Sequence, residues 1–118
     1  NMFQVTFSEQ SLSILGGLSR AEQLGVIEKL SSLGNSIVSG EASNLGKFTR
    51  KGKIIYRMRF GDLRIYFEKN GPALHCLYML EKNSVQDFLV RCKIPSSEET
   101  ILEKHQSFWD FLEHIAKK

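Results

Sequence analysis

The chain has 118 residues, of which 42% are hydrophobic and 25% are charged, a profile typical of one compact globular domain with a buried core. This content excludes an intrinsically disordered chain, and the apolar runs at 54–56 and 77–80 are far shorter than the roughly 20 residues that cross a bilayer. The beginning of the chain shows no leader pattern, so we predict a cytoplasmic protein with no membrane partner.

The positive charge is concentrated between Lys47 and Lys69. This stretch holds eight basic and two acidic residues and carries +6, whereas the whole chain carries +3. The basic residues alternate with apolar and aromatic ones, which is the pattern of a strand with one polar face. A basic face interleaved with Tyr and Phe is typical of a surface that binds a polyanion.

The N-terminal third predicts one strand and two helices. Residues 3–7 alternate apolar and polar side chains, which predicts a strand, and Ser8 can cap a short helix that ends at the glycine pair 16–17. The capping-box pattern of residues 19–22 opens a longer helix, which Gly34-Asn35 is expected to break or kink near its end. The apolar stripe of this longer helix comprises Leu24, Ile27, Leu30, Leu33 and Ile37. This helical pair is expected to cover one face of a sheet.

Residues 39–43 form a polar connection, and the strands are expected to begin from Leu45, with the basic residues of 47–53 in or beside a flexible lead-in. Residues 54–60 and 63–67 predict a hairpin joined by a tight turn at Gly61-Asp62. Because side chains alternate along a strand, one face of the hairpin is apolar and the other is cationic. The arginines on the cationic face are Arg57, Arg59 and Arg64.

The rest of the chain predicts one more strand and two helices. Residues 70–72 form a second turn, residues 74–80 a third strand, and Ser84 can cap a short helix that Pro95 stops. A second capping-box pattern at residues 96–99 begins an amphipathic helix of about 20 residues. Its apolar stripe contains Phe108, Trp109 and Leu112, and such large side chains need a cover. Either the chain's own sheet covers them, or they form an interface with a partner or a second copy.

The two cysteines, Cys76 and Cys92, have neither the number nor the spacing of a zinc site or a disulfide framework. We predict two buried, reduced thiols, and no metal or cofactor.

The order of these elements and two sequence motifs resemble the RelE/ParE superfamily of toxins from bacterial toxin–antitoxin systems, and the RelE branch in particular. The motifs are YRMRFGDLRIYFE at 56–68 and LHCLYMLEKN at 74–83, and Leu45-Gly46-Lys47 resembles the lead-in of the family hairpin. The resemblance extends over roughly residues 3–91.

The resemblance implies an α+β fold with a β-α-α-β-β-β core, a small mostly antiparallel sheet and two N-terminal helices on one face. We divide the chain into this toxin core, 2–92, and a linker with the C-terminal amphipathic helix, 93–118. The implied activity is an mRNA interferase that cleaves ribosome-bound mRNA without metal, represses translation, inhibits growth and is held by a cognate antitoxin. The ParE branch acts instead on DNA gyrase.

The resemblance also implies roles for individual residues. Arg57, Arg59 and Arg64 match the basic positions of the family hairpin, and arginine stabilises phosphate charge rather than acting as a base. After the last strand the family pattern is not kept, because Asn83 stands where an arginine is expected and apolar residues stand where a Tyr or His is expected. Lys82, His75 and Tyr66 are the candidates to replace these groups. The other predicted RNA contacts are Lys47, Arg50, Lys51, Lys53 and Asn83.

Several alternatives stay open from the residues alone. The arginines could be ordinary solvated charges on a strand. The nearby carboxylates Glu68 and Glu81 could act as bases or form salt bridges with these arginines. The tail, 97–118, carries −2 and could cover the cationic face, which would make the chain self-inhibited. The alternative function is a protein without catalysis, either a ParE-like gyrase inhibitor or a degenerate member that binds RNA or a partner.

Overall fold

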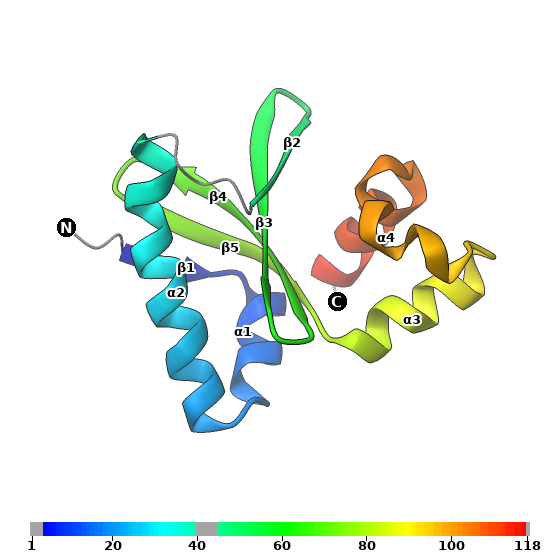
Figure 1. Cartoon of the computed structure of the whole chain (residues 1–118), viewed down its shortest axis with the longest axis horizontal. Helices are drawn as coiled ribbons and strands as arrows, with labels where there is room; N and C mark the ends of the chain where they lie inside the picture. Colours follow the sequence, from blue (N-terminus) through cyan, green and yellow to red (C-terminus); the bar gives the residue numbers. More distant parts are fainter. Residues whose placement is uncertain (1–3, 40–44, 118) are drawn as a thin grey trace.

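A five-stranded mixed sheet with helices on both faces forms the centre of the computed structural model, which describes residues 4–39 and 45–117 (Figure 1). The elements are β1 (Gln4–Phe7), α1 (Glu9–Gly16), α2 (Arg20–Ser39), β2 (Gly46–Arg50), β3 (Lys53–Phe60), β4 (Leu63–Asn70), β5 (Ala73–Leu80), α3 (Lys82–Arg91), the 3₁₀ helix η1 (Ser96–Lys104) and α4 (Gln106–Ala116).

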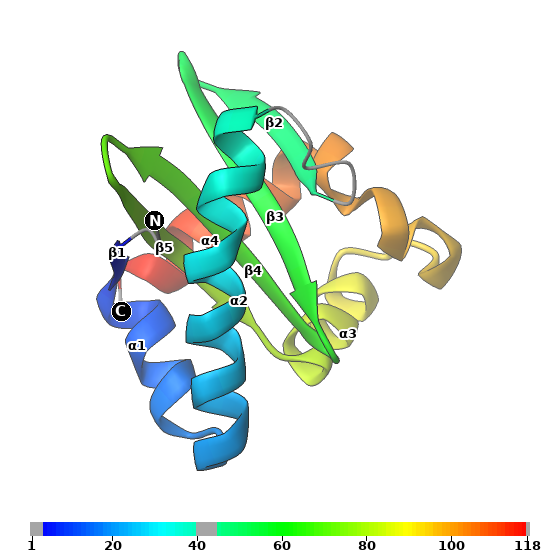
Figure 2. The same ribbon diagram turned by 60° about the vertical axis from the view of Figure 1, so that its left-hand side comes forward.

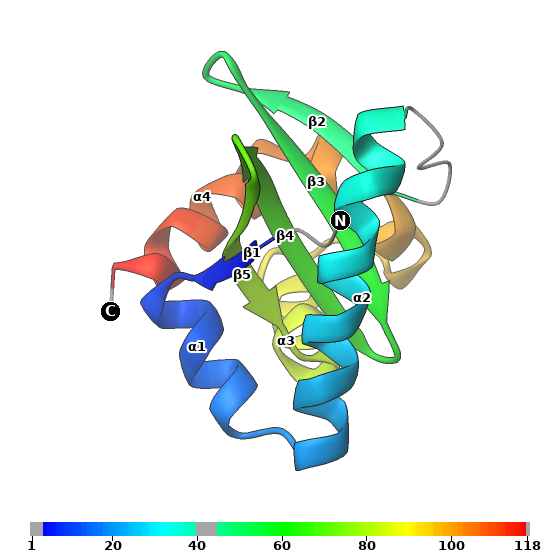
Figure 3. The ribbon, with the colours of Figure 1, turned by 90° about the vertical axis from the view of Figure 1, so that its left-hand side faces the viewer.

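The strand order is β1-β5-β4-β3-β2. β1 runs parallel to β5, and the other neighbours are antiparallel. The helical pair α1 and α2 covers one face of this sheet, and the C-terminal elements cover the other (Figure 2). Figure 3 shows the sheet between α2 and α4. The structure therefore confirms the predicted α+β architecture with its two N-terminal helices on one face.

The core on the helical side joins α2 to the middle strands. Val26 and Leu30 of α2 are fully buried against apolar residues of the sheet. Gly25 faces the sheet where a β-carbon would lie 2.6 Å from the ring of Phe60, so the absence of a side chain permits this close approach. The residues that the sheet contributes to this core include Met58, Leu63, Ile65, Phe67, Leu74, Cys76 and Met79.

A second core lies on the opposite face of the sheet and is rich in aromatic residues. Phe108 packs against Tyr66 and Phe88, with ring centroids 5.8 and 5.5 Å away. Trp109 meets Tyr66 and Phe48 at 5.9 Å each. The tail's apolar stripe is thus covered by the chain's own sheet and α3, the first of the two covers that the sequence left open.

The start signals of α1 and α2 are confirmed. The Ser8 side chain accepts a hydrogen bond from the backbone N–H of Ser11. In the capping box, the Glu22 N–H donates to the Ser19 hydroxyl and the Ser19 N–H donates to the Glu22 carboxylate, at 3.2 Å each. Gly61 has a positive φ of 58°, which suits the predicted turn between β3 and β4.

Two predictions before the hairpin are corrected. α2 continues through residues 34–35 without ending, because its face packs on the sheet and tertiary contacts outweigh the low helix propensity of glycine. The lead-in is a strand, β2, which pairs with β3 from Gly46 opposite Arg57 to Arg50 opposite Lys53. Phe3 and the part of the polar connection at 40–43 lie outside the described residues.

Three predictions in the C-terminal part are also corrected. α3 begins at Lys82, so Ser84 lies inside the helix and does not cap it. The tail is not one helix, because η1 ends at Lys104, the backbone of His105 is extended, and α4 begins only at Gln106. The Trp109 indole N–H donates to the Glu103 carbonyl at 2.8 Å and so takes up a backbone acceptor at the end of η1. Cys76 is buried as predicted, but Cys92 is exposed.

Phe108 tests how much the second core contributes to stability. Replacing Phe108, which is fully buried, with alanine should lower the free energy of unfolding by about 3–5 kcal/mol in urea denaturation, since the cavity cannot close fully. Val90 is 78% exposed, and Val90→Ala should stay within about 0.5 kcal/mol of wild type. Equal effects of the two changes would contradict this packing.

The two thiols should differ in reactivity. Burial raises the pKa of Cys76 to about 12, so at pH 8 its thiolate is scarce as well as inaccessible. We expect a thiol reagent to label one group per folded chain, at Cys92, and the second only after unfolding. The Cys92→Ser variant should show no labelling while folded, and rapid labelling of that variant would argue against a buried Cys76.

Candidate functional site

The predicted arginines come together on the face of β3 and β4 that lies beneath the tail. In the register of this pair, Arg59 is opposite Arg64, and Arg57 is opposite Tyr66. Alternation along each strand places all four side chains on one face, while Met58 and Ile65 point to the α2 side. The prediction that three arginines share one face is confirmed, but this face is not open to solvent.

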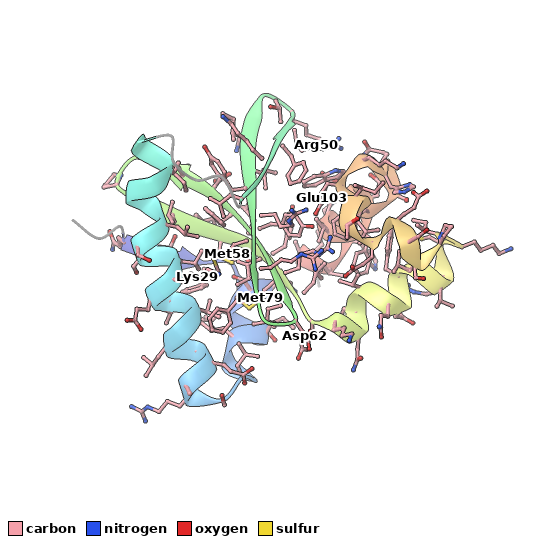
Figure 4. All side chains as sticks on the ribbon, in the orientation of Figure 1. Lys29, Arg50, Met58, Asp62, Met79 and Glu103 are labelled. Atoms are coloured by element: carbon pink, nitrogen blue, oxygen red, sulfur yellow. The ribbon has the colours of Figure 1, made fainter. Side chains whose placement is uncertain are left out.

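The carboxylate of Glu103, in η1, contacts three of these groups. Figure 4 shows Glu103 between the sheet and the C-terminal elements. Its Oε1 accepts a hydrogen bond from Arg57 Nη1 at 3.0 Å. Its Oε2 accepts from Arg64 Nη1 at 3.1 Å and from the Tyr66 hydroxyl at 2.5 Å. The side chains of Arg64 and Glu103 are each only 2% exposed. We call Arg57, Arg64, Tyr66 and Glu103 the buried ion cluster.

Glu99, four residues before Glu103 in η1, extends these contacts toward solvent. Arg64 Nη2 donates to the Glu99 carbonyl at 2.9 Å, and the Glu99 carboxylate lies 3.4 Å from the same nitrogen. This carboxylate also lies 3.7 Å from Arg59, whose side chain is 43% exposed. The guanidinium of Arg64 is therefore held by the tail through both a backbone and two side-chain acceptors.

Burial raises the pKa of Tyr66 well above its usual range, and the neighbouring Glu103 carboxylate adds to the shift. Both effects penalise the phenolate, which carries a negative charge in a poorly solvated place next to another anion. Tyr66 therefore remains a protonated hydrogen-bond donor at any physiological pH. Together with the two arginines it forms a set of donors directed at a single oxyanion.

The cations of the β2–β3 hairpin also meet the tail. Arg50 Nη2 donates to Gln106 Oε1 at 2.7 Å, and its guanidinium lies 4.9 Å from the Trp109 ring centroid. Lys51 Nζ lies 3.1 Å from the Glu113 carboxylate in an exposed pair. Lys47 and Lys53 are exposed on the two strands. These four residues form a basic rim beside the buried ion cluster.

A cleft of about 420 Å³ opens beside Arg57, between β2 and η1. Lys47 and Lys104 stand on its two sides, so a ligand in it would meet cations from both elements. Arg57 lies over the Phe48 ring with its guanidinium carbon 5.7 Å from the centroid. The complete lining is Gly46, Lys47, Phe48, Arg57, Thr100, Ile101, Glu103 and Lys104.

The remaining predicted site residues lie elsewhere. His75 is on β5, where its Nδ1 is 2.7 Å from the Thr6 hydroxyl. Its neighbour across the strand pair is Glu68, four positions from Arg64, which corresponds to about 13 Å along a strand. Lys82 and Asn83 open α3 and line a different hollow next to the β3–β4 turn. The structure thus brings together the hairpin arginines and Tyr66, but not His75, Lys82 or Asn83.

The predicted interface residues of the tail are part of the core. Phe108 and Leu112 are fully buried and Trp109 is 4% exposed, all within this one chain. Their side chains pack against β4, β2 and α3 and present no free surface to a second copy.

Sequence reasoning missed Glu99 and Glu103. The sequence suggested Glu68 and Glu81 as partners of the arginines, but the partners in the structure are Glu99 and Glu103 of the tail. The available signal was the charge of residues 98–103, which hold three glutamates and no basic residue and so could pair with a cationic face.

Solved structures provide the comparison that decides the fold. A RelE–RelB complex from the archaeon Pyrococcus horikoshii OT3 matches with a TM-score of 0.54 and 23% sequence identity, over 68% of this chain and 94% of that chain. This chain has a RelE-like fold. A RelB–RelE antitoxin–toxin complex from Methanococcus jannaschii is also similar, with a TM-score of 0.48 and 21% identity over 70% of this chain and 96% of that one. About a third of the present chain lies outside the RelE-like match.

Other comparisons and searches gave no match. No protein-family model and no curated protein matches the chain.

Within residues 4–39 and 45–117, no His, Cys, Asp or Glu side chains gather in a group that could hold a metal ion. None of the described helices combines the length and the apolar character that a membrane span requires.

The buried ion cluster predicts a large effect of removing Arg64. In Arg64→Ala, the carboxylate of Glu103 stays buried with one arginine fewer, so we expect the free energy of unfolding to fall by about 3–5 kcal/mol in urea denaturation. The control is Arg91→Ala, which breaks the exposed Arg91–Asp87 pair and should change stability by about 0.5 kcal/mol or less. A loss of about 1 kcal/mol or less in Arg64→Ala would mean that solvent already screens the cluster.

Proposed function

We propose that this chain is the toxin of a toxin–antitoxin system and binds ribosome-bound mRNA, which it cleaves as a RelE-like mRNA interferase. The observation that carries this proposal is the set of donors on β3 and β4 of a RelE-like fold. Arg57, Arg64 and Tyr66 converge on one oxyanion, here the Glu103 carboxylate. A phosphodiester has oxygens of the same charge sign and similar spacing, which arginine binds with two parallel N–H groups.

The chemistry would be cleavage of the phosphodiester by the RNA's own 2′-hydroxyl. Two guanidinium groups stabilise the negative charge that develops on the phosphorus oxygens in the transition state. The protonated Tyr66 hydroxyl adds a donor to the same oxygens. The exposed cations Lys47, Lys53 and Lys104 would attract the backbone on either side of the scissile bond, a contribution that weakens with salt.

The RelE–RelB composition of the structural neighbours supports an antitoxin as the protein partner. We propose that such a partner binds this chain through contacts outside the tail-covered sheet face, since that face is already occupied.

A second candidate is binding without cleavage, as an inhibitor of gyrase or as an RNA- or partner-binding protein. The observation that favours it is the position of His75, Lys82 and Asn83, which lie away from the arginines. The proton-transfer groups that cleavage needs are therefore less well supported than the phosphate contacts.

Induced expression in a bacterium, followed by primer extension on a translated message, tests the proposal. Wild type should arrest growth and produce new 5′ ends within coding sequence. Arg57→Ala should lower cleavage at least tenfold, because one transition-state charge contact is lost, whereas the Arg91→Ala control should cleave as wild type does.

Growth arrest without new 5′ ends would favour the second candidate. A DNA supercoiling assay with purified gyrase would then separate gyrase inhibition from RNA binding. If Arg57→Ala arrests growth and cleaves as well as wild type, the role proposed for this sheet face is wrong.

A further inference from the structure

We propose that Glu103 is an internal competitor of RNA: its carboxylate occupies an oxyanion site that a phosphodiester takes when η1 moves off the sheet. The ligand's identity as RNA rests on the function proposed above. The existence of the oxyanion site, and its occupation by the tail, rest on the contacts alone.

The site is complete without Glu103. Its donors, Arg57, Arg64 and Tyr66, come from neighbouring positions of β3 and β4, whose backbones are fixed by the hydrogen bonds of the sheet. All three donate to Glu103, and both carboxylate oxygens are used. Removing the Glu103 carboxylate would leave Arg57 without this counter-ion and Arg64 with only the partly exposed Glu99, in a poorly solvated place, which favours uptake of another anion.

The tail is matched to the cationic face beyond this single contact. Glu99 lies near Arg59 and Arg64, and Gln106 accepts from Arg50. η1 itself holds three acidic residues and one basic residue. The chain's own acidic segment therefore meets the cations that the sequence assigns to RNA, so tail and RNA would compete for the same groups.

η1 can move without unfolding α4. η1 consists of two short 3₁₀ segments that meet at a kink at Ile101, where the backbone is non-helical. It lies between Pro95 and His105, both of which have extended ψ values. Leu102 is the one fully buried apolar residue of η1, whereas α4 contributes Phe108, Trp109 and Leu112 to the same core. The two parts of the tail are thus attached by different contacts.

The chain contains its own reporter of this movement. Trp109 is the only tryptophan, and its indole N–H donates to the Glu103 carbonyl at 2.8 Å. Displacing η1 would break this hydrogen bond and change the surroundings of the indole. Tryptophan emission therefore follows the position of η1 in the unmodified chain.

The deciding experiment compares wild type, Glu103→Gln and Glu113→Gln. Both variants lose one tail carboxylate, but only Glu103 occupies the oxyanion site, and Glu113 pairs with Lys51 in solvent. Binding of a labelled single-stranded RNA 12-mer is measured by anisotropy. We expect Glu103→Gln to bind at least tenfold more tightly than wild type and Glu113→Gln to change affinity less than twofold. In wild type, RNA should shift the emission of Trp109.

Inorganic phosphate provides a second readout that does not depend on RNA. At matched ionic strength, phosphate should raise the Tm of Glu103→Gln more than that of wild type or of Glu113→Gln. If phosphate stabilises Glu103→Gln but no form of the protein binds or cleaves RNA, the internal competitor is supported and the proposed function fails. If wild type binds RNA as tightly as Glu103→Gln and its Trp109 emission does not change, the internal competitor is wrong and the proposed function stands.

Glu99→Gln keeps the proposal testable if Glu103→Gln does not fold. Its carboxylate is partly exposed, and its loss leaves the buried contact between Arg64 and Glu103 intact. We expect about threefold tighter RNA binding, smaller than for Glu103→Gln because only the outer contact is removed. No gain for Glu99→Gln, together with no gain for any folded Glu103 variant, would overturn the proposal.

Discussion

The buried contact of Glu103 with Arg57, Arg64 and Tyr66 is the constraint on which the arrangement of the tail depends. A carboxylate in so poorly solvated a place is costly unless its charge is matched and both oxygens accept hydrogen bonds. Here both conditions are met by donors from two adjacent strands. Because these donors have fixed positions in the sheet register, they determine where η1 lies, and the chain must turn at His105 before α4 can begin.

The two faces of the sheet have different surroundings. On the α2 side, the strands present a conventional apolar core. On the other side, an aromatic core around Phe108 and Trp109 lies next to a cluster of charged groups. The aromatic residues supply most of the attraction, since apolar burial is the dominant favourable term, whereas a buried ion pair mainly specifies position. The aromatic residues of α4 thus provide most of the attraction to the sheet, whereas Glu103 of η1 specifies the position of the tail.

About a third of this chain lies outside the RelE-like match, and the tail covers one face of the sheet without closing it completely. The cleft between β2 and η1 still gives access to Arg57, and two residues of the basic rim, Lys47 and Lys53, are exposed. The chain therefore has two distinct properties: exposed cations that can attract a polyanion, and a proposed phosphate site that the tail covers. The first is a long-range property of net charge, whereas the second depends on whether η1 stays in place.

Local sequence signals predicted the elements well because they act over a few residues. Ser8, the Ser19–Glu22 capping box and the Gly61 turn all have the expected geometry, and alternation placed Arg57, Arg59 and Arg64 on one face. The errors have the opposite origin. α2 passes through residues 34–35 because of packing, and β2 is a strand because β3 offers it a partner. The tail breaks at His105 because of contacts made with strands some 40 positions earlier, such as Arg64 with Glu103.

By itself the sequence determined the fold class, the order of the elements and the identity of the cationic face, since patterning and capping are local. It could not show what covers that face, because the choice between solvent, a partner and the chain's own tail depends on long-range packing. Only the tertiary structure decided that Glu103 fills the space between Arg57 and Arg64, and that Cys92 is exposed while Cys76 is buried. A carboxylate's partner is set by position in three dimensions, and distance along the chain carries little information about it.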